Sequence, residues 1–224
     1  MYEVEVIVVE NVLNYDESNV KNKNRHLIIE KARDLFISEG IHNPTMKDIA
    51  NAAGISLRSL YDYYQTKDHL VIDIQIVTMS LIDSSFSNYQ YNPSKTAFQN
   101  LQSVIEIVYK DLLDNQKAIK YITAFDYYFY NSYPDNRYNI YLNSLKSSNV
   151  PIKIIEHAMK DESIRFYHDD PMLTLITIFQ SLLAYAQKII YREKAMLSED
   201  ISGKGDLSIF KEVILNGLKK QHQV

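Results

Sequence analysis

Residues 27–40 read LIIEKARDLFISEG, and residues 43–70 read NPTMKDIANAAGISLRSLYDYYQTKDHL. The first segment has the i, i+4, i+7, i+8 spacing of apolar residues that marks one face of an amphipathic helix. The residues on that face are Ile28, Ala32, Leu35 and Phe36. We expect Gly40 to end this helix, because glycine accepts the left-handed conformation that closes many helices. Pro44 then keeps the chain extended before the next element.

A second and a third short helix are expected after Pro44. Thr45 and Asp48 have the spacing of a capping box, in which each residue bonds to the backbone of the other. The apolar positions that follow are Met46, Ile49, Ala50 and Ala53. Gly54 tolerates a positive φ, and Ser56 is placed to cap a third helix over residues 57–64. Two short helices joined by a glycine-containing turn describe a helix-turn-helix, whose second helix enters the major groove of DNA.

A three-helix bundle without a partner is the alternative explanation of this spacing. Two details favour DNA binding. The third helix has a narrow apolar face, Leu60 and Tyr64, so most of its surface is left for another use. Thr66 and Lys67 follow at the start of a fourth helix, where exposed N–H groups beside a lysine suit a phosphate.

The run from Gly40 to Leu70 resembles the DNA-binding domain of the tetracycline-repressor (TetR) family. The positions that match the family pattern are Thr45, Ile49, Ala50, Ala53, Gly54, Ile55, Ser56, Leu60, Tyr61, Tyr64, Lys67 and Leu70. Three positions depart from it: Arg58 stands where a small residue is usual, Leu57 where a polar one is usual, and Tyr64 where Phe is usual. The resemblance implies an all-α regulator with a three-helix DNA-binding domain and a helical domain for dimerisation and effector binding.

The resemblance also assigns the residues that meet double-stranded DNA. Those expected at the groove and its edges are Ser56, Leu57, Arg58, Ser59 and Tyr61; those expected to hold phosphates are Thr45, Lys47, Tyr63 and Lys67. Arg58 suits a two-pronged hydrogen bond to guanine, and it suits a phosphate equally well. Sequence does not separate these two roles.

Composition supports a helical, DNA-associated protein. Glycine and proline number five each in 224 residues, which disfavours a turn-rich β fold. Residues 21–70 hold eight Lys or Arg against six Asp or Glu, so a small basic surplus lies on the expected DNA-binding domain. The chain has no cysteine, which fits a reducing cytoplasm. The acidic N-terminus does not read as a secretory signal, and we expect no membrane association.

The expected organisation is about nine helices in three parts. Residues 1–20 form a flexible arm, residues 21–70 the DNA-binding domain, and residues 71–224 the effector-binding and dimerisation domain. The last two helices have wide apolar faces, which favours a four-helix interface in a two-fold dimer over burial inside one subunit. The expected interface residues are Phe179, Leu182, Leu183, Ala186, Ile190, Phe210, Val213 and Ile214.

The middle of the chain is rich in tyrosine and predicts an effector pocket. Aromatic rings with hydroxyl tips suit aromatic or cationic ligands, through stacking and cation–π contacts. The expected lining residues are Glu106, Tyr109, Phe125, Asp126, Phe129 and Tyr141. The alternatives are ordinary core and surface tyrosines, and a DNA-binding adaptor that answers a protein partner or no ligand.

An enzyme is disfavoured because the sequence lacks the usual catalytic motifs. It has no Gly-rich phosphate loop, no His-Glu-x-x-His, no Gly-x-Ser-x-Gly and no cysteine nucleophile. His168, Asp169 and Asp170 are adjacent, but such a run more often caps a helix than binds a metal. We therefore expect no cofactor and no metal.

Overall fold

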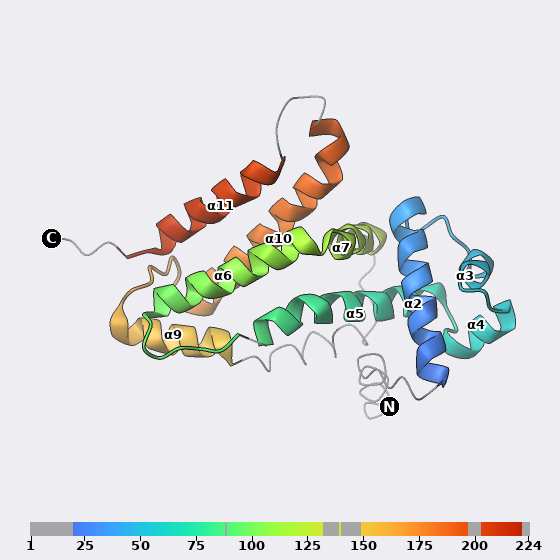
Figure 1. Cartoon of the computed structure of the whole chain (residues 1–224), viewed down its shortest axis with the longest axis horizontal. Helices are drawn as coiled ribbons and strands as arrows, with labels where there is room; N and C mark the ends of the chain where they lie inside the picture. Colours follow the sequence, from blue (N-terminus) through green and yellow to red (C-terminus); the bar gives the residue numbers. More distant parts are fainter. Residues whose placement is uncertain (1–19, 88, 132–138, 140–148, 197–202, 221–224) are drawn as a thin grey trace. The chain divides into compact units, whose positions relative to one another are not determined.

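The computed structural model describes residues 20–87, 89–131, 139, 149–196 and 203–220. Nine helices lie in these ranges and confirm the all-α fold class (Figure 1). They are α2 (Val20–Glu39), α3 (Met46–Ala52), α4 (Leu57–Tyr63), α5 (Lys67–Ser87), α6 (Ala97–Asp114), α7 (Gln116–Tyr128), α9 (Val150–Asp161), α10 (Pro171–Met196) and α11 (Gly203–Leu218). Nearly all of the expected N-terminal arm, residues 1–19, lies outside the described residues.

The chain divides into two compact units. The first contains the described parts of residues 1–81 and 120–146, and the second those of 82–119 and 147–224. Two helices continue from one unit into the other: α5 crosses the boundary after Leu81, and α7 crosses it after Ile119.

The core of the first unit forms where the predicted apolar faces meet. Ile28, Ala32 and Phe36 of α2 are fully buried, together with Ile49 of α3 and Leu60 of α4. Each of these helices is too short or too polar to be stable alone, so their packing supplies most of their stability. The helical spacing in the sequence therefore identified the buried face correctly.

Part of α7 belongs to this first core, which extends the unit beyond the boundary at residue 70 expected from sequence. Tyr121 is fully buried and donates its hydroxyl to the carbonyl of Val71, at 2.8 Å. Phe125, one turn later, is also buried in the same cluster. The second half of α7 is therefore packed with the helices of the expected DNA-binding domain.

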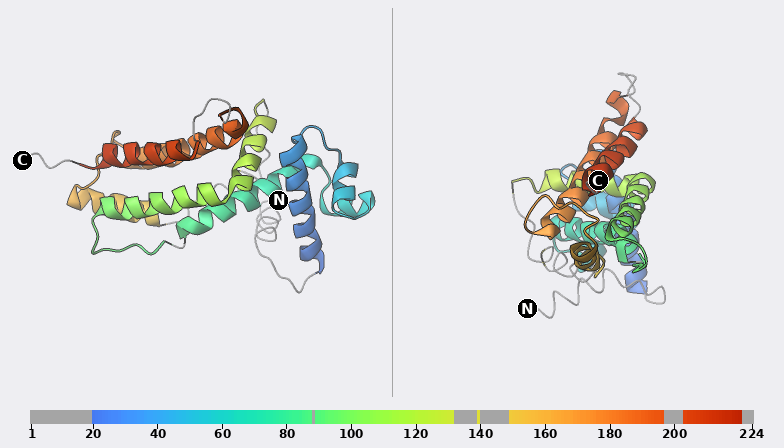
Figure 2. Two further views of the ribbon diagram at one scale, coloured as in Figure 1. Left: turned by 45° about the horizontal axis from the view of Figure 1, so that its top comes forward. Right: turned by 90° about the vertical axis from the view of Figure 1, so that its left-hand side faces the viewer.

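The second unit is built around α6, α9, α10 and α11. Leu101, Ile105, Ile154, Leu182 and Leu218 lie in its core. Figures 1 and 2 show α10 and α11 running side by side, in agreement with their extensive contact. The C-terminal end of α11 is tied to the loop between α9 and α10 by an antiparallel bridge between Ile164 and Lys219.

Helix α10 starts where the sequence indicates. The Asp170 carboxylate accepts a hydrogen bond from the Met172 N–H at 2.9 Å, and Pro171 occupies the first turn. The part of the chain that the structure describes contains one stretch, Pro171–Ile190, that is long and apolar enough for a membrane span by length and composition alone, which leaves the expectation of no membrane association untested. Only 28% of this stretch is buried. Helix α10 therefore carries much apolar surface that the described residues do not cover.

Candidate nucleic-acid interface

The turn between α3 and α4 depends on Gly54. Its φ is +67°, a conformation that residues with a side chain rarely adopt, although no atom lies close enough to obstruct a Cβ. The N–H of Ile55 bonds back to the Ala50 carbonyl at 3.0 Å and closes the turn. The chain then enters α4 through Ser56, whose hydroxyl oxygen accepts from the Ser59 N–H at 3.0 Å. These contacts fix the direction in which α4 leaves the turn.

The capping box expected at the start of α3 is present. The Thr45 hydroxyl oxygen accepts from the Asp48 N–H at 3.3 Å, and the Asp48 carboxylate accepts from the Thr45 N–H at 2.9 Å. The Thr45 hydroxyl also donates to that carboxylate, at 2.5 Å. These bonds lower the pKa of Asp48, with the side-chain bond from Thr45 as the largest cause. Asp48 is therefore ionised at neutral pH and holds the helix start.

Helix α4 has one buried face and one exposed face. Leu60 and the following Tyr64 are buried against the first core. On the other side, Arg58 is exposed, Leu57 is 39% exposed and Tyr61 is 47% exposed. With Arg58, this exposed leucine and tyrosine form an apolar and basic surface that the described residues of the first unit do not cover.

The residues assigned to phosphates differ in their surroundings. Lys47 on α3 is exposed, whereas Tyr63 is half-buried and packs against the first core. Thr45 is exposed, but its hydroxyl is engaged with Asp48. Lys47 is the only charged side chain of these three, and it is exposed on the helix that precedes the turn.

Lys67 has a structural role that the sequence did not indicate. Its ammonium donates to three backbone carbonyls of the loop between α2 and α3: Ile41 at 2.7 Å, Pro44 at 3.0 Å and His42 at 3.1 Å. An ammonium has three hydrogens, so these bonds use its full donor capacity. Partial burial lowers the pKa of Lys67, and the neighbouring Asp68 opposes this shift. The arrangement argues against the phosphate contact that sequence analysis assigns to Lys67.

The residues assigned to an effector pocket do not form one site. Glu106 and Tyr109 lie in the second unit, whereas Phe125, Asp126 and Phe129 lie in the first. Phe125 is a core residue, Asp126 is exposed, and the rings of Phe125 and Phe129 pack at 4.9 Å. Tyr141 lies outside the described residues.

Glu106 and Tyr109 hold a cation that belongs to the chain itself. The ammonium of Lys211, a buried residue on α11, bonds to the Glu106 carboxylate at 2.6 Å. The same ammonium lies 4.4 Å from the centre of the Tyr109 ring. Two side chains that sequence analysis places in the ligand pocket therefore hold Lys211, and the contact links α6 to α11.

The expected dimer residues also divide into two groups. Leu182 and Ala186 are buried within the second unit, so they are not surface residues as the sequence analysis expected. The others are half-buried, except Val213, which is 61% exposed: Phe179, Leu183, Ile190, Phe210 and Ile214. Other apolar side chains that sequence analysis did not select are exposed on the same two helices: Leu173, Ile176 and Ile209.

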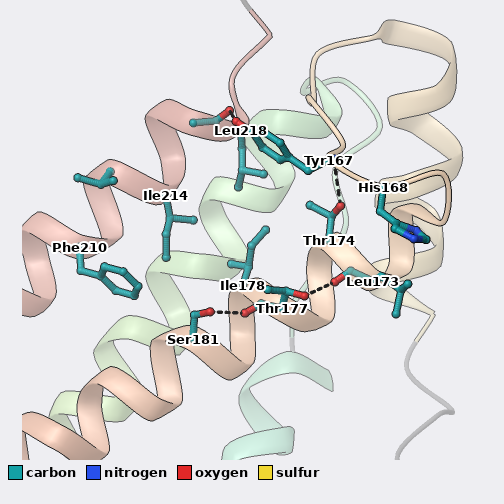
Figure 3. A pocket seen from close by; sticks show the side chains of 12 residues that line it. Tyr167, His168, Leu173, Thr174, Thr177, Ile178, Ser181, Phe210, Ile214 and Leu218 are labelled. Carbon is teal, nitrogen blue, oxygen red and sulfur yellow. Dashed lines mark hydrogen bonds between the residues drawn. The ribbon is translucent and has the colours of Figure 1, made fainter.

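An open groove of about 600 Å³ lies between α10 and α11 (Figure 3). Tyr167 and His168 lie toward one end and Phe210 toward the other. Small polar residues on α10 line its floor, and their hydroxyls are turned to the backbone: Thr177 donates to the Leu173 carbonyl at 2.7 Å, and Ser181 donates to the Thr177 carbonyl at 2.6 Å. The groove therefore presents a mostly apolar surface. The sequence signal for it was the run of small residues at helical spacing, Thr174, Thr177 and Ser181.

Comparison with known proteins agrees with this architecture. Residues 28–74 match the family described as bacterial regulatory proteins, tetR family. The chain is 24% identical over 218 residues to the HTH-type transcriptional repressor KstR2 of Rhodococcus jostii, covering 92% of this chain and 97% of that protein.

Solved structures of transcriptional regulators have the same fold as this chain, and two of them illustrate the likeness. A TetR family transcription regulator from Marinobacter aquaeolei has a TM-score of 0.64 at 14% identity, covering 90% of this chain and 98% of that one. The ketosteroid transcriptional regulator KstR2 of Mycobacterium tuberculosis has a TM-score of 0.55 at 14% identity, covering 88% and 95%.

The different surroundings of Lys67 and Lys47 lead to a test. Lys67→Met should lower the free energy of unfolding by about 1–3 kcal/mol, because three carbonyls lose a charged donor. Lys47→Met should leave stability nearly unchanged and reduce the slope of log K against log salt by about 0.9 per subunit, the value for one phosphate contact. Chemical denaturation and DNA binding at several salt concentrations measure both effects. A stable Lys67→Met protein with a reduced salt slope would restore the phosphate role to Lys67.

Proposed function

The chain belongs to the TetR family of transcriptional regulators, and from this premise we propose that it is a homodimeric repressor of a palindromic DNA operator. The observation that carries the proposal is the exposed face of α4, held in place by the Gly54 turn, the Ser56 cap and the buried Leu60. DNA binding implies a cytoplasmic location, and we assign the chain no catalytic role.

The exposed face of α4 supplies the base-reading part of the proposal. Arg58 would read a guanine, since the guanidinium matches the two acceptors of that base in the major groove. Leu57 would contact a thymine methyl group, and Ser56, Ser59 and Tyr61 would contact the groove edges. Lys47, with Thr45 and Tyr63, would hold the phosphate backbone on either side.

A second copy of the chain is the proposed occupant of the apolar surface on α10 and α11. Four exposed side chains support this: Leu173 and Ile176 on α10 are 44% and 42% exposed, and Ile209 and Val213 on α11 are 63% and 61% exposed. The groove between the two helices adds a hollow that a partner helix would fill. Two subunits related by a two-fold axis would then present two copies of α4 to half-sites about one DNA turn apart.

Release of the operator by a small apolar or aromatic ligand is the finer part of the proposal. One structural relative is a ketosteroid transcriptional regulator, which makes apolar small molecules the class of ligand to test first. The packed rings of Phe125 and Phe129 lie in the part of α7 that belongs to the DNA-binding unit. A ligand that moves these rings would act directly on that unit.

An adaptor without a small-molecule ligand is the second candidate. The observation in its favour is that Glu106 and Tyr109, selected as ligand-binding residues, are engaged by Lys211. The two candidates differ in one respect: only the first predicts that a small molecule weakens operator binding.

Arg58→Ala tests base reading. Loss of a two-pronged bond to guanine should reduce the preference for the operator over a scrambled duplex by roughly 10- to 100-fold. Lys47→Ala is the matched control, since loss of a phosphate contact should weaken both duplexes equally. Competition binding with the two duplexes measures the ratio. An unchanged ratio for Arg58→Ala would show that Arg58 does not read a base.

Val213→Glu and Ile209→Glu test the dimer surface. Burial of an unpaired carboxylate should weaken dimerisation by roughly 3 kcal/mol, about a hundredfold. Met159→Glu on α9 is the control, because Met159 is 67% exposed in the same unit but lies on another helix. Sedimentation at several protein concentrations reports the state of each variant. Dimers of undiminished stability in both α11 variants would contradict the proposed surface.

Phe129→Ala tests ligand release. A panel of small apolar and aromatic molecules should contain one that weakens operator binding by the wild-type protein, and Phe129→Ala should respond to it at least about tenfold less. Tyr130→Ala, at a site that is 81% exposed, should respond as the wild type does. Equal responses from all three proteins would exclude Phe129 from the ligand site, and a panel without effect would favour the adaptor.

A further inference from the structure

Tyr128, the last residue of α7, contacts three residues of the DNA-binding unit at once. Its hydroxyl donates to the Asp68 carboxylate at 2.6 Å. Its ring packs on the His42 ring, with 4.7 Å between centres, and the Lys67 ammonium lies 5.8 Å from the ring centre. We call His42, Lys67, Asp68 and Tyr128 the Tyr128 cluster. All four residues belong to the first compact unit.

The hydroxyl of Tyr128 is a permanent donor in this cluster. Burial raises its pKa, and the hydrogen bond to Asp68 and the charge of that carboxylate raise it further. The hydroxyl is therefore protonated at neutral pH and is available to donate to Asp68.

The Tyr128 cluster contains residues from both ends of the helix-turn-helix, which we call the bracket: the loop before α3 and the first turn of α5. His42 lies in the loop that leads into α3, and Lys67 and Asp68 form the first turn of α5, which follows α4. Lys67 joins the two ends of this bracket, because its ammonium binds the carbonyls of residues 41, 42 and 44. A side chain from α7 thus contacts the chain just before α3 and just after α4.

The neighbours of Tyr128 show that this contact is selective. Tyr127 and Tyr130 are 75% and 81% exposed, whereas Tyr128 is half-buried. Tyr127 touches His42 only at ring edges, with 6.2 Å between centres. Tyr128 is therefore the side chain through which the end of α7 holds the bracket.

We propose that Tyr128 is a positioning residue for operator recognition, through which α7 sets the orientation of the recognition helix α4. The proposal rests on the DNA-binding function proposed above. Both α5 and α7 continue from the second unit into the first. With Tyr128 in place the helix-turn-helix is held by both helices. Without it, α7 keeps the contacts of Tyr121 and Phe125 with the first core but loses its contact with the two ends of the helix-turn-helix, and the two recognition helices of a dimer gain freedom relative to one another.

Half-site spacing provides a measurement that a purely structural role would not change. The full-length protein is first used to select its operator from a random duplex pool. A set of duplexes is then made in which the two half-sites are moved apart one base pair at a time. We expect Tyr128→Ala to bind the preferred spacing about tenfold more weakly and the other spacings with little change. The spacing profile should therefore become flatter.

Three further variants locate the effect within the cluster. Tyr128→Phe keeps the ring on His42 but loses the bond to Asp68, so it should fall between wild type and Tyr128→Ala. His42→Ala removes an exposed ring and should flatten the profile even if Tyr128→Ala fails to fold. Tyr130→Ala, two residues away and exposed, should match the wild-type profile.

The possible outcomes separate this inference from the function on which it rests. Equal weakening at every spacing, in step with a loss of folded protein, would make Tyr128 a packing residue and overturn the inference. An unchanged profile for both His42→Ala and Tyr128→Phe would overturn it as well. A wild-type protein that selects no duplex would overturn the proposed function itself.

Discussion

Helix α4 has seven residues, and Leu60 is the single buried residue among them. A helix of that length is unstable in water, since too few backbone bonds offset the cost of ordering the chain. Its geometry is therefore imposed from outside, by the Ser56 cap, the Gly54 turn and the packing of Leu60 and Tyr64 in the first core. The same constraint is compatible with the proposed function: because so little of α4 is needed for the core, its outer face is available to a partner such as DNA. Stability and recognition thus use opposite sides of one short element.

The sequence predicted the parts of the fold that depend on neighbouring residues. The Thr45–Asp48 capping box, the glycine turn, the Ser56 cap and the start of α10 at Pro171 all follow from residue types at fixed local spacing. The buried face of α2 follows from helical periodicity. Periodicity shows which residues of a helix are buried but not which other elements pack against them. These signals act over a few residues, and the structure agrees with each of them.

The sequence could not predict which distant groups meet. Lys67 lies at a helix start, as a phosphate-binding lysine often does, but its ammonium binds backbone carbonyls some 25 positions earlier in the chain. Glu106 and Tyr109 suit a cation, and the cation is Lys211. Leu182 and Ala186 have the helical spacing expected of a dimer interface, but they are buried in the core of their own unit. In each case these side chains are engaged by a contact within the chain, which local sequence patterns do not reveal. The Tyr128 cluster has no local signal at all, because its members come from three separate elements.

Operator recognition by the proposed dimer requires two copies of α4 to be presented together to a duplex. Selection of bound DNA from a random pool by the purified wild-type protein tests this most directly, since it requires both DNA binding and two-fold symmetry. The account predicts enrichment of a palindrome whose half-sites lie about 10 base pairs apart, centre to centre, or a multiple of that spacing. A pool that remains unenriched at low ionic strength, where phosphate contacts are strongest, would contradict it.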